Sequence, residues 1–274
     1  MSAVVIIPAR YGSTRFPGKL LSLLSGKPVI RHVYERAMTA TLADSVIVAT
    51  DSDKIHQTVR SFGGDAVMTS SEHPSGTDRI AEVARGADYD IIVNVQGDEP
   101  LIMGEMIDSV ISLLEDSRAD MGTLVKRIED PEEVFDPNVV KVVFDTQGFA
   151  LYFSRAPIPF YREEFPDCRF SIDDCRLNKK KISSSQSSVG NRQSSIINLQ
   201  LHKHIGIYSY RRDVLLRLTE LSQSALEKAE KLEQLRALEN GYRIKVGITG
   251  HETIGVDTRE DMEKVERWLG ESGK

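Results

Sequence analysis

Cysteine, net positive charge and long apolar runs are all scarce in this sequence of 274 residues. The two cysteines, Cys168 and Cys175, lie close together in a polar segment, which argues against a secreted domain framed by disulfides. The formal net charge of −6 argues against a general nucleic-acid binder, for which a basic excess is expected. No apolar run approaches the roughly 18 to 20 residues of a membrane span, and no charged-then-apolar leader opens the sequence. We therefore expect a cytoplasmic protein without a membrane span.

What the sequence does contain is a regular alternation of short apolar runs and helical stripes. With 40% hydrophobic residues the chain can bury one large α/β core, and a second domain is possible but not required. The first run, Val4–Ile7, is too short for a helix and predicts a buried parallel strand that Pro8 ends. Similar runs lie at 46–50, 66–68 and 91–95, and amphipathic helical patterns follow each of them. This alternation is typical of a doubly wound, mostly parallel sheet.

The pattern changes from Met121 onwards. Strand-like runs at 121–125, 139–144 and 149–153 are separated by turn signals, and the turn at 145–148 predicts a hairpin. We expect these antiparallel strands to extend the sheet or to build a small second lobe. The later elements are predicted as a strand at 204–210, a helix bearing Val214, a helix from Ser224 to Gly241, strands at 243–248 and 254–257, and a last helix that Thr258 and Asp261 cap.

The segment 162–203 departs from this pattern. It is rich in serine, and its basic residues, including Lys179 and Lys203, are matched by no carboxylate after Asp174. We interpret it as a disordered or weakly ordered surface insertion in a single domain that spans residues 1–274.

Three cations lie on the loop after the first strand, at Arg10, Arg15 and Lys19. Ligands of open α/β sheets bind beyond the carboxyl ends of the strands, where this loop falls, although a basic surface loop without function is the alternative. The loop is not a Walker P-loop, because five residues instead of four separate Gly12 from Gly18 and Leu20 replaces the Ser or Thr that would hold Mg²⁺. The sequence therefore predicts phosphate binding by another class of nucleotide enzyme.

Two aspartates that end short apolar runs are candidate metal ligands. Asp98 follows the strand at 91–95 and a glycine that lets a ligand approach, which suits Mg²⁺ because hard cations take oxygen ligands. A turn-forming Asp98, and an Asp257 that serves only the dipole of the following helix, are the simpler alternatives. Together the two carboxylates could clamp one metal on a triphosphate whose charge the three cations also meet.

Other candidates have ordinary explanations as well. Ser75 and Asp78 form a capping box at a helix start, whose hydroxyls and amides could instead face a nucleotide, and this leaves Arg79 free. A zinc site made of the two cysteines with His202 and His204 is disfavoured, because the spacings C-x6-C and H-x-H fit no common structural site. Glu233 and Gln234 could be exposed helix residues and nothing more.

Nine motifs in order resemble the 3-deoxy-manno-octulosonate (Kdo) cytidylyltransferases, the CMP-Kdo synthetases of lipopolysaccharide assembly. They cover the chain except for 162–203. The motifs are IPARYGSTRFPGK at 7–19, VATD at 48–51, FGGDAVMTS at 62–70, SGTDR at 75–79, VNVQGDEP at 93–100, ALYFSRAPIPF at 150–160, HIGIYSYR at 204–211, LEQLRALENG at 232–241 and GVDTREDMEKVE at 255–266.

The resemblance implies a fold like that of the nucleotidyl-sugar transferases, a homodimer, and the Mg²⁺-dependent reaction of CTP with Kdo to give CMP-Kdo and diphosphate. By motif, Arg10, Arg15 and Lys19 would hold the triphosphate, and Asp98 and Asp257 would be the metal ligands, so that Lys19, Arg15 and these aspartates form the expected catalytic set. The expected cytidine contacts are Pro8, Ala9, Ser75, Thr77 and Arg79. The expected sugar contacts are Gln96, His204, Tyr208, Glu233 and Gln234.

The sequence differs from the family pattern at two places, and two alternative functions remain open. Leu20 stands where many relatives have proline, and the insertion enters just before the expected sugar residues His204 and Tyr208. The rivals are the same reaction on the 8-amino analogue of Kdo, and a nucleotide-binding regulator that has lost catalysis. The presence of both expected metal carboxylates argues against the regulator.

Overall fold

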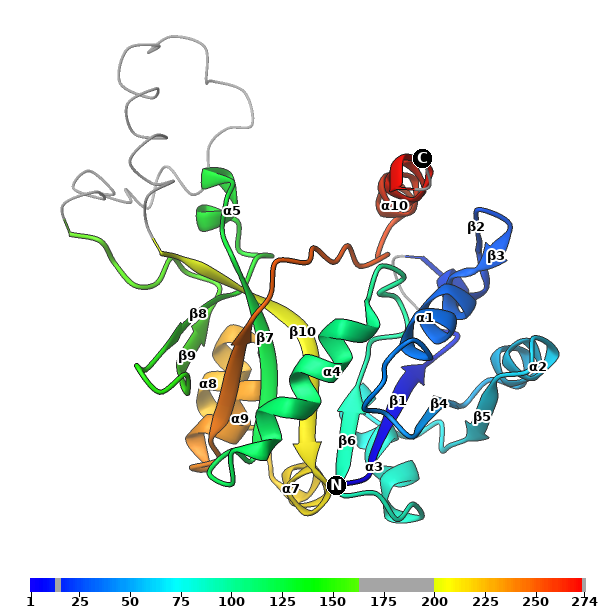
Figure 1. Cartoon of the computed structure of the whole chain (residues 1–274), viewed down its shortest axis with the longest axis horizontal. Coiled ribbons are helices and arrows are strands. Elements are labelled where there is room, and N and C mark those ends of the chain that lie inside the picture. Colours follow the sequence, from blue (N-terminus) through cyan, green and yellow to red (C-terminus); the bar gives the residue numbers. More distant parts are fainter. Residues whose placement is uncertain (13–15, 163–199, 273–274) are drawn as a thin grey trace, which may run out of the picture.

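The computed structural model describes residues 1–12, 16–162 and 200–272. A nine-stranded sheet runs through the molecule in the order β11-β7-β10-β6-β1-β4-β5, with β8 beside β10 and β9 beside β8 (Figure 1). These strands are β1 (Ala3–Ala9), β4 (Ser45–Thr50), β5 (Asp65–Met68), β6 (Ile91–Asn94), β7 (Met121–Arg127), β8 (Lys141–Phe144), β9 (Ala150–Ser154), β10 (His202–Arg211) and β11 (Ile244–Ile248). A separate two-stranded sheet is formed by β2 (Leu23–Leu24) and β3 (Lys27–Pro28).

Strand pairing separates a parallel part of the sheet from an antiparallel lobe. Strands β6, β1, β4 and β5 are parallel to their neighbours in that series, as the alternation predicts. Strand β10 runs antiparallel to β6, β7 and β8, and β8 forms the predicted hairpin with β9. The predicted α/β class, with a mostly parallel sheet and a smaller antiparallel lobe, is confirmed.

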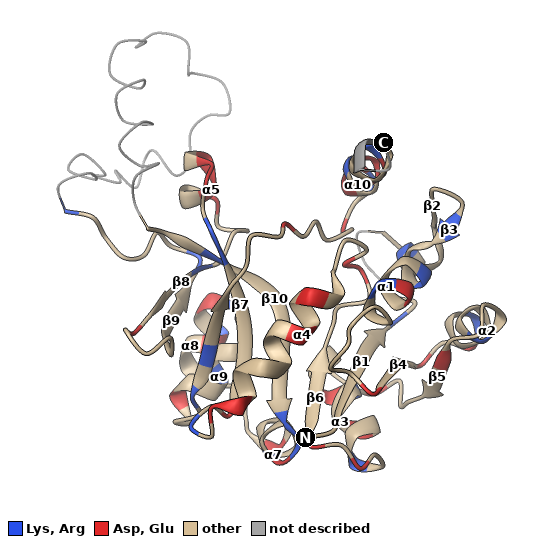
Figure 2. Ribbon diagram, in the orientation of Figure 1, with Lys and Arg blue, Asp and Glu red and all other residues tan. Residues whose placement is uncertain are grey.

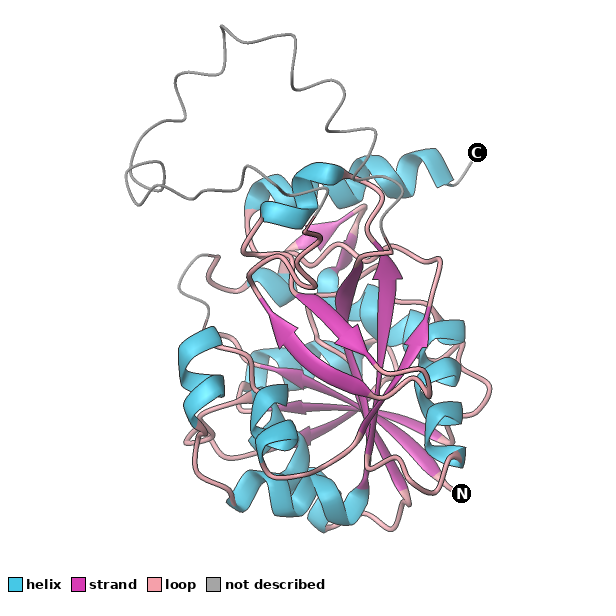
Figure 3. Ribbon diagram, turned by 90° about the vertical axis from the view of Figure 1, so that its left-hand side faces the viewer, coloured by secondary structure: helices cyan, strands magenta, loops and turns pink. Residues whose placement is uncertain are grey.

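Helices cover both faces of the sheet (Figure 3). Strand β1 is buried on both sides: Val5 and Ile7 pack in one core, and Val4 and Ile6 pack in the other. The first core also contains residues of α1 (Val29–Ala37), α2 (Asp53–Ser61), α4 (Gly104–Ser112) and α10 (Arg259–Ser272). The second contains residues of α3 (Gly76–Arg85), α7 (Arg212–Glu220) and α9 (Gln234–Glu239). Within the described residues, the remaining helices are α5 (Pro131–Phe135), α8 (Ala225–Glu230) and the 3-10 turns η1 (Lys19–Leu21) and η2 (Leu113–Glu115).

Four element predictions are wrong in detail. Pro8 does not end the first strand, because β1 continues to Ala9 beside β4. The pairing of β1 with β6 stops at Ile6, so the amide hydrogen that Pro8 lacks is not needed for a bond to β6. The predicted strand at 254–257 is an irregular segment. The single helix at 224–241 is two helices, α8 and α9, because Lys231 adopts a left-handed conformation with φ of 56°.

The fourth correction concerns the end of the insertion. Strand β10 begins at His202, and Leu201 is buried against Ile128 and Val134. Lys203, expected to lack an acidic partner, pairs with Glu133 and Glu252. The rest of the predicted insertion, including both cysteines, lies outside the described residues apart from Arg162 and Gln200.

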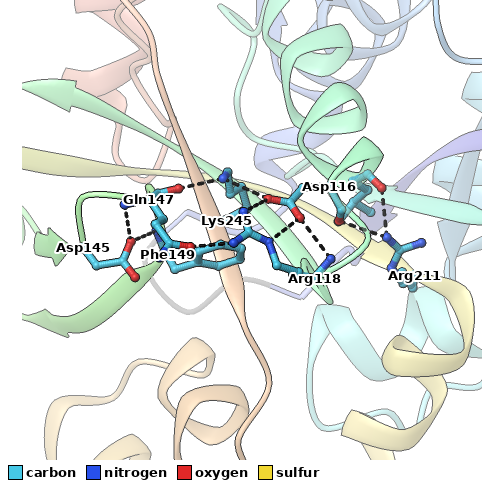
Figure 4. Close-up of polar contacts among 8 residues, drawn as sticks. Asp116, Arg118, Asp145, Gln147, Phe149, Arg211 and Lys245 are labelled. Carbon is cyan, nitrogen blue, oxygen red and sulfur yellow. Dashed lines mark hydrogen bonds and ion pairs between the residues drawn. The ribbon is translucent and has the colours of Figure 1, made fainter.

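The hairpin of β8 and β9 closes back on the far edge of the sheet. Phe149 bridges to Lys245 of β11, and Val246 N donates to Gly148 O at 2.8 Å. Around the Phe149 ring, Lys245 Nζ lies 4.5 Å from the centroid and also contacts Asp116 at 3.1 Å (Figure 4). Asp116 also pairs with Arg118 at 2.8 Å. These contacts fix the lobe against β11 and thereby the start of the segment that leads to Asp257.

Candidate active site

The carboxyl ends of β1 and β6 bring one lysine between two aspartates. Lys19 begins η1 directly after Gly18, whose φ of 70° is readily adopted only by glycine. Lys19 Nζ contacts Asp98 Oδ2 directly and lies 2.8 Å from Asp257 Oδ1. Burial alone would lower the pKa of Lys19, but the charges and hydrogen bonds of Asp98 and Asp257 outweigh it and raise the pKa. The Lys19 side chain therefore stays positively charged. The expected convergence of these three residues is present in the structure.

Asp257 reaches this place on a long irregular connector, residues 249–258, that crosses from β11 to α10. Val256 N donates to Asp98 O at 2.8 Å, which ties the connector to the end of β6. Thr258 and Asp261 cap α10 as predicted, with Thr258 N donating to Asp261 Oδ2 at 2.9 Å. These bonds hold Asp257 beside Asp98 although the connector has no regular structure.

An ionic network holds the middle of the connector. Glu252 lies 2.7 Å from Lys126 of β7 and 2.9 Å from Lys203 of β10, and Lys203 also contacts Glu133 of α5 at 2.6 Å. Figure 2 shows acidic positions on α5 and on the connector and basic positions on β7. The network joins the lobe to the segment that carries Asp257.

Glu99, which follows Asp98, is buried behind the connector. Burial, and next the charge of Asp98, raise the pKa of Glu99 to about 7. Glu99 Oε2 has no hydrogen-bond partner among the described residues, while Thr253 bonds to the carboxyl group. The QGDEP motif contained this residue, but its burial depends on the path of the connector and could not be seen in the sequence.

A cavity of about 300 Å³ adjoins the Lys19 cluster. Its wall contains most of the residues predicted for the nucleotide and the metal: Pro8, Ala9, Arg10, Lys19, Ser75, Arg79, Asp98 and Asp257. Arg15 lies outside the described residues. Arg79 is 4% exposed and donates to Asp51 Oδ2 at 2.7 Å, so it is not free as the sequence suggested, and its charge is already neutralised.

A second cavity of about 160 Å³ shares Gln96 with the first. Its wall contains the predicted sugar residues Gln96, Tyr208, Glu233 and Gln234, together with Thr77, which was predicted for the nucleotide. The break between α8 and α9 places Glu233 at the start of α9, where it is partly buried in the cavity wall rather than on an exposed helix face. Burial raises the pKa of Glu233, and a hydrogen bond from Thr77 opposes this rise.

His204 does not line either cavity but packs behind Tyr208, with ring centroids 5.2 Å apart. The hydroxyl of Thr123 donates to Ile207 O at 2.8 Å, so it accepts from His204 Nε2 at 2.9 Å. Burial lowers the pKa of His204 to about 3. A neutral His204 in this place supports Tyr208 from behind.

Among the cavity residues that the sequence reasoning missed, four have polar side chains able to bond a ligand. His73 lines the first cavity, and Asn94, Tyr210 and Arg236 line the second. His73 stands two residues before the Ser75 cap, and Asn94 two before Gln96, so both lay within the quoted motifs or at their edges. Arg236 is bonded to Glu227 by two bonds, of 2.6 and 2.8 Å, a pairing that only the helix break explains.

The donor atoms around Lys19 fit a hard divalent cation. The ammonium group stands between two carboxylates, in the manner of a bound cation. Among the described residues there is no cluster of three or more His, Cys, Asp or Glu side chains suited to a metal, so the protein offers two oxygen ligands at this point. Mg²⁺ commonly takes one or two carboxylates and completes its shell with phosphate and water.

No helix within 1–12, 16–162 and 200–272 is long and apolar enough to cross a bilayer.

Comparison with known proteins gives consistent matches over the whole chain. The sequence profile of the cytidylyltransferase family matches residues 4–245. A 3-deoxy-manno-octulosonate cytidylyltransferase of Geotalea daltonii is 52% identical, with all of both chains covered. One of Thermodesulfovibrio yellowstonii is 50% identical over 98% of each chain. The solved CMP:2-keto-3-deoxy-manno-octonic acid synthetase complexed with CTP is 38% identical, with a TM-score of 0.82 over 99% of this chain and 100% of the other.

Proposed function

This chain belongs to the cytidylyltransferase family, and within it to the 3-deoxy-manno-octulosonate cytidylyltransferases, and we propose that it converts CTP and Kdo into CMP-Kdo and diphosphate. The observation that carries the proposal is the meeting of Asp98, Asp257 and Lys19 at a cavity that shares Gln96 with a second one. One cavity suits a triphosphate beside cations, and the other suits a polyhydroxylated acid among amide, hydroxyl and carboxyl groups.

The reaction joins the anomeric oxygen of the sugar acid to the α-phosphorus of CTP and breaks the bond to diphosphate. Placement of the two reactants in line, with neutralisation of the charge on the leaving group, supplies most of the rate enhancement in such transfers. Arg10 and Lys19 line the triphosphate cavity and would meet that charge. Gln96, in the wall of both cavities, would touch the sugar acid next to the reacting phosphate.

Asp98 and Asp257 would hold Mg²⁺, with Lys19 moving from the carboxylates to the phosphates. The ion, when bound, neutralises phosphate charge and makes a bound hydroxyl more acidic. Gln96, which both cavity walls contain, carries an amide that cannot act as a general base, and Glu99 and His204 line neither cavity.

The decisive experiment measures diphosphate release by the purified protein with CTP. Release that requires both Mg²⁺ and Kdo supports the proposal, and release without sugar, or none at all, contradicts it. Parallel assays with the 8-amino analogue of Kdo distinguish the rival substrate. A homodimer is part of the proposal on the family likeness alone, and light scattering during size-exclusion chromatography tests it.

A further inference from the structure

One wall of the first cavity is formed by the loop before α3. This loop contributes His73, Pro74, Ser75 and Gly76, and it packs closely on β1, since a Cβ at Gly76 would lie 3.3 Å from Pro8 Cγ. Among the described residues of this wall, the one cation is Arg79 of α3, whose guanidinium is bonded to Asp51. Such a wall suits the uncharged base of a nucleotide better than its phosphates.

The ring of His73 is held by a carboxylate outside the cavity. Its Nε2 contacts Glu82 Oε2 directly, and Ser70 N donates to the same oxygen at 3.0 Å. The hydrogen bond with His73, and next the one with Ser70, lower the pKa of Glu82. An ionised carboxylate can only accept hydrogen bonds, so Nε2 of His73 carries the hydrogen. In the tautomer with its hydrogen on Nε2, the other ring nitrogen, Nδ1, is an acceptor.

We propose that Nδ1 of His73 accepts a hydrogen bond from the exocyclic amino group of cytosine, and that Glu82 holds the ring in the tautomer with Nε2 as donor and Nδ1 as acceptor. Cytosine presents an amino donor at C4, whereas uracil presents a carbonyl acceptor there. With uracil, two acceptors would face each other. His73 is therefore a specificity residue that selects a 4-amino pyrimidine nucleoside triphosphate over its 4-oxo analogue. This inference rests on the proposed function.

The test compares CTP with UTP in kcat/KM, at saturating Kdo and mildly alkaline pH, for the wild type and four variants. His73→Phe keeps a ring without nitrogen, and its CTP-over-UTP ratio should fall roughly tenfold, which is the size of one lost hydrogen bond. The loss should lie in KM for CTP, with kcat nearly unchanged, since the base is bound alike before and during the reaction. His73→Asn carries a carbonyl oxygen near the place of Nδ1 and should recover part of the ratio.

Glu82→Leu keeps the imidazole but removes the carboxylate that fixes its tautomer, so the CTP-over-UTP ratio should also fall. Glu72→Gln is the matched control, because Glu72 is an exposed neighbouring carboxylate that bonds to Ser71 rather than to His73. Its ratio should equal that of the wild type. Thermal unfolding of each variant separates misfolding from altered selectivity.

Equilibrium binding of CTP and UTP without sugar gives a readout that does not need turnover. A wild type that binds or uses both nucleotides equally overturns the inference, and so does a folded His73→Phe or Glu82→Leu protein with the wild-type ratio. A wild type that prefers CTP in binding, with a ratio that His73→Phe lowers, supports the inference even if no CMP-sugar forms. In that last case the proposed function fails while the role of His73 stands.

Discussion

Asp98 and Asp257 contact the same ammonium group, that of Lys19, although one lies in the turn after β6 and the other on the connector before α10. The two carboxylates would repel each other without a cation between them. In this structure Lys19 supplies that cation, and a metal ion on a nucleotide can take its place only if Lys19 turns to the phosphates. The lysine and the proposed metal ion would thus be alternative partners of one acidic pair.

Replacement of Lys19 should be severe. We expect Lys19→Ala to lower turnover by roughly 10²-fold or more, because a fixed cation at the leaving phosphates stabilises charge that develops during transfer. Steady-state kinetics at saturating CTP measures this effect. Lys27→Ala is the control, because it removes a cation of the β2–β3 hairpin that pairs with Glu35 of α1. This variant should keep nearly the wild-type turnover. Near wild-type turnover of Lys19→Ala would remove Lys19 from the mechanism.

Asp98→Asn and Asp257→Asn should each weaken binding of the metal. We expect each variant to lose roughly 10²-fold in activity at fixed Mg²⁺, because a neutral amide attracts a divalent cation far less than a carboxylate does. Electron paramagnetic resonance of Mn²⁺ in the presence of CTP should show weaker binding in both. Glu260→Gln changes an exposed acid in the first turn of α10 and should bind as the wild type does. Unchanged Mn²⁺ affinity in both aspartate variants would rule out the predicted ligands.

His204 should make stability depend on pH in a defined window. Its pKa is lowered from 6.5 to about 3 by burial. Above pH 6.5 both states are neutral and the residue adds no pH dependence. As the pH falls from 6.5 towards 3, the unfolded chain binds a proton that the folded protein does not, so folding is disfavoured.

Denaturant unfolding of the wild type and of His204→Gln at several pH values measures this contribution. The difference in unfolding free energy between them should be constant above the window and should shrink or reverse within it as the pH falls. A difference that does not change with pH would show that His204 titrates alike in both states.

We expect the ionic network of the connector to help hold Asp257 in position. In Glu252→Ala, Lys126 and Lys203 lose a shared partner while their side chains are only 13% and 11% exposed. Because Glu252 itself is 39% exposed, we expect a loss of only about 1–2 kcal/mol in unfolding free energy, with a weaker response to Mg²⁺. Glu129→Ala is the matched control, since Glu129 is 75% exposed and lies 3.5 Å from Lys126. Equal effects of the two variants on stability and on the Mg²⁺ response would contradict this role.

Leu201 should behave as a core residue. It is 1% exposed, and we expect Leu201→Ala to cost about 2–4 kcal/mol of unfolding free energy, against almost nothing for the exposed neighbour in Gln200→Ala. Thermal or urea unfolding measures both. An unchanged unfolding free energy in Leu201→Ala would show that the insertion extends to residue 203, as the sequence predicted. Any deletion of the insertion should accordingly stop before Leu201.

The sequence was most informative where one strand and the loop after it carry the function. The apolar run at Val4–Ile7, the cations after it and Asp98 after β6 needed only the rule that ligands gather at the carboxyl ends of parallel strands. It was least informative where a side chain depends on a distant partner. Arg79 is neutralised by Asp51, and the left-handed Lys231 breaks a helix whose apolar stripe runs on without interruption. The periodicity of the sequence contains neither fact.

The order in which the chain is made gives the connector another consequence. Lys19 and Asp257 are 238 residues apart in the sequence, so the acidic pair is completed only once the connector has been synthesised. The parallel part of the sheet can form earlier, because β1, β4, β5 and β6 all precede residue 95. A chain that stops before the connector would thus lack one of the two carboxylates that contact Lys19, even with these four strands in place.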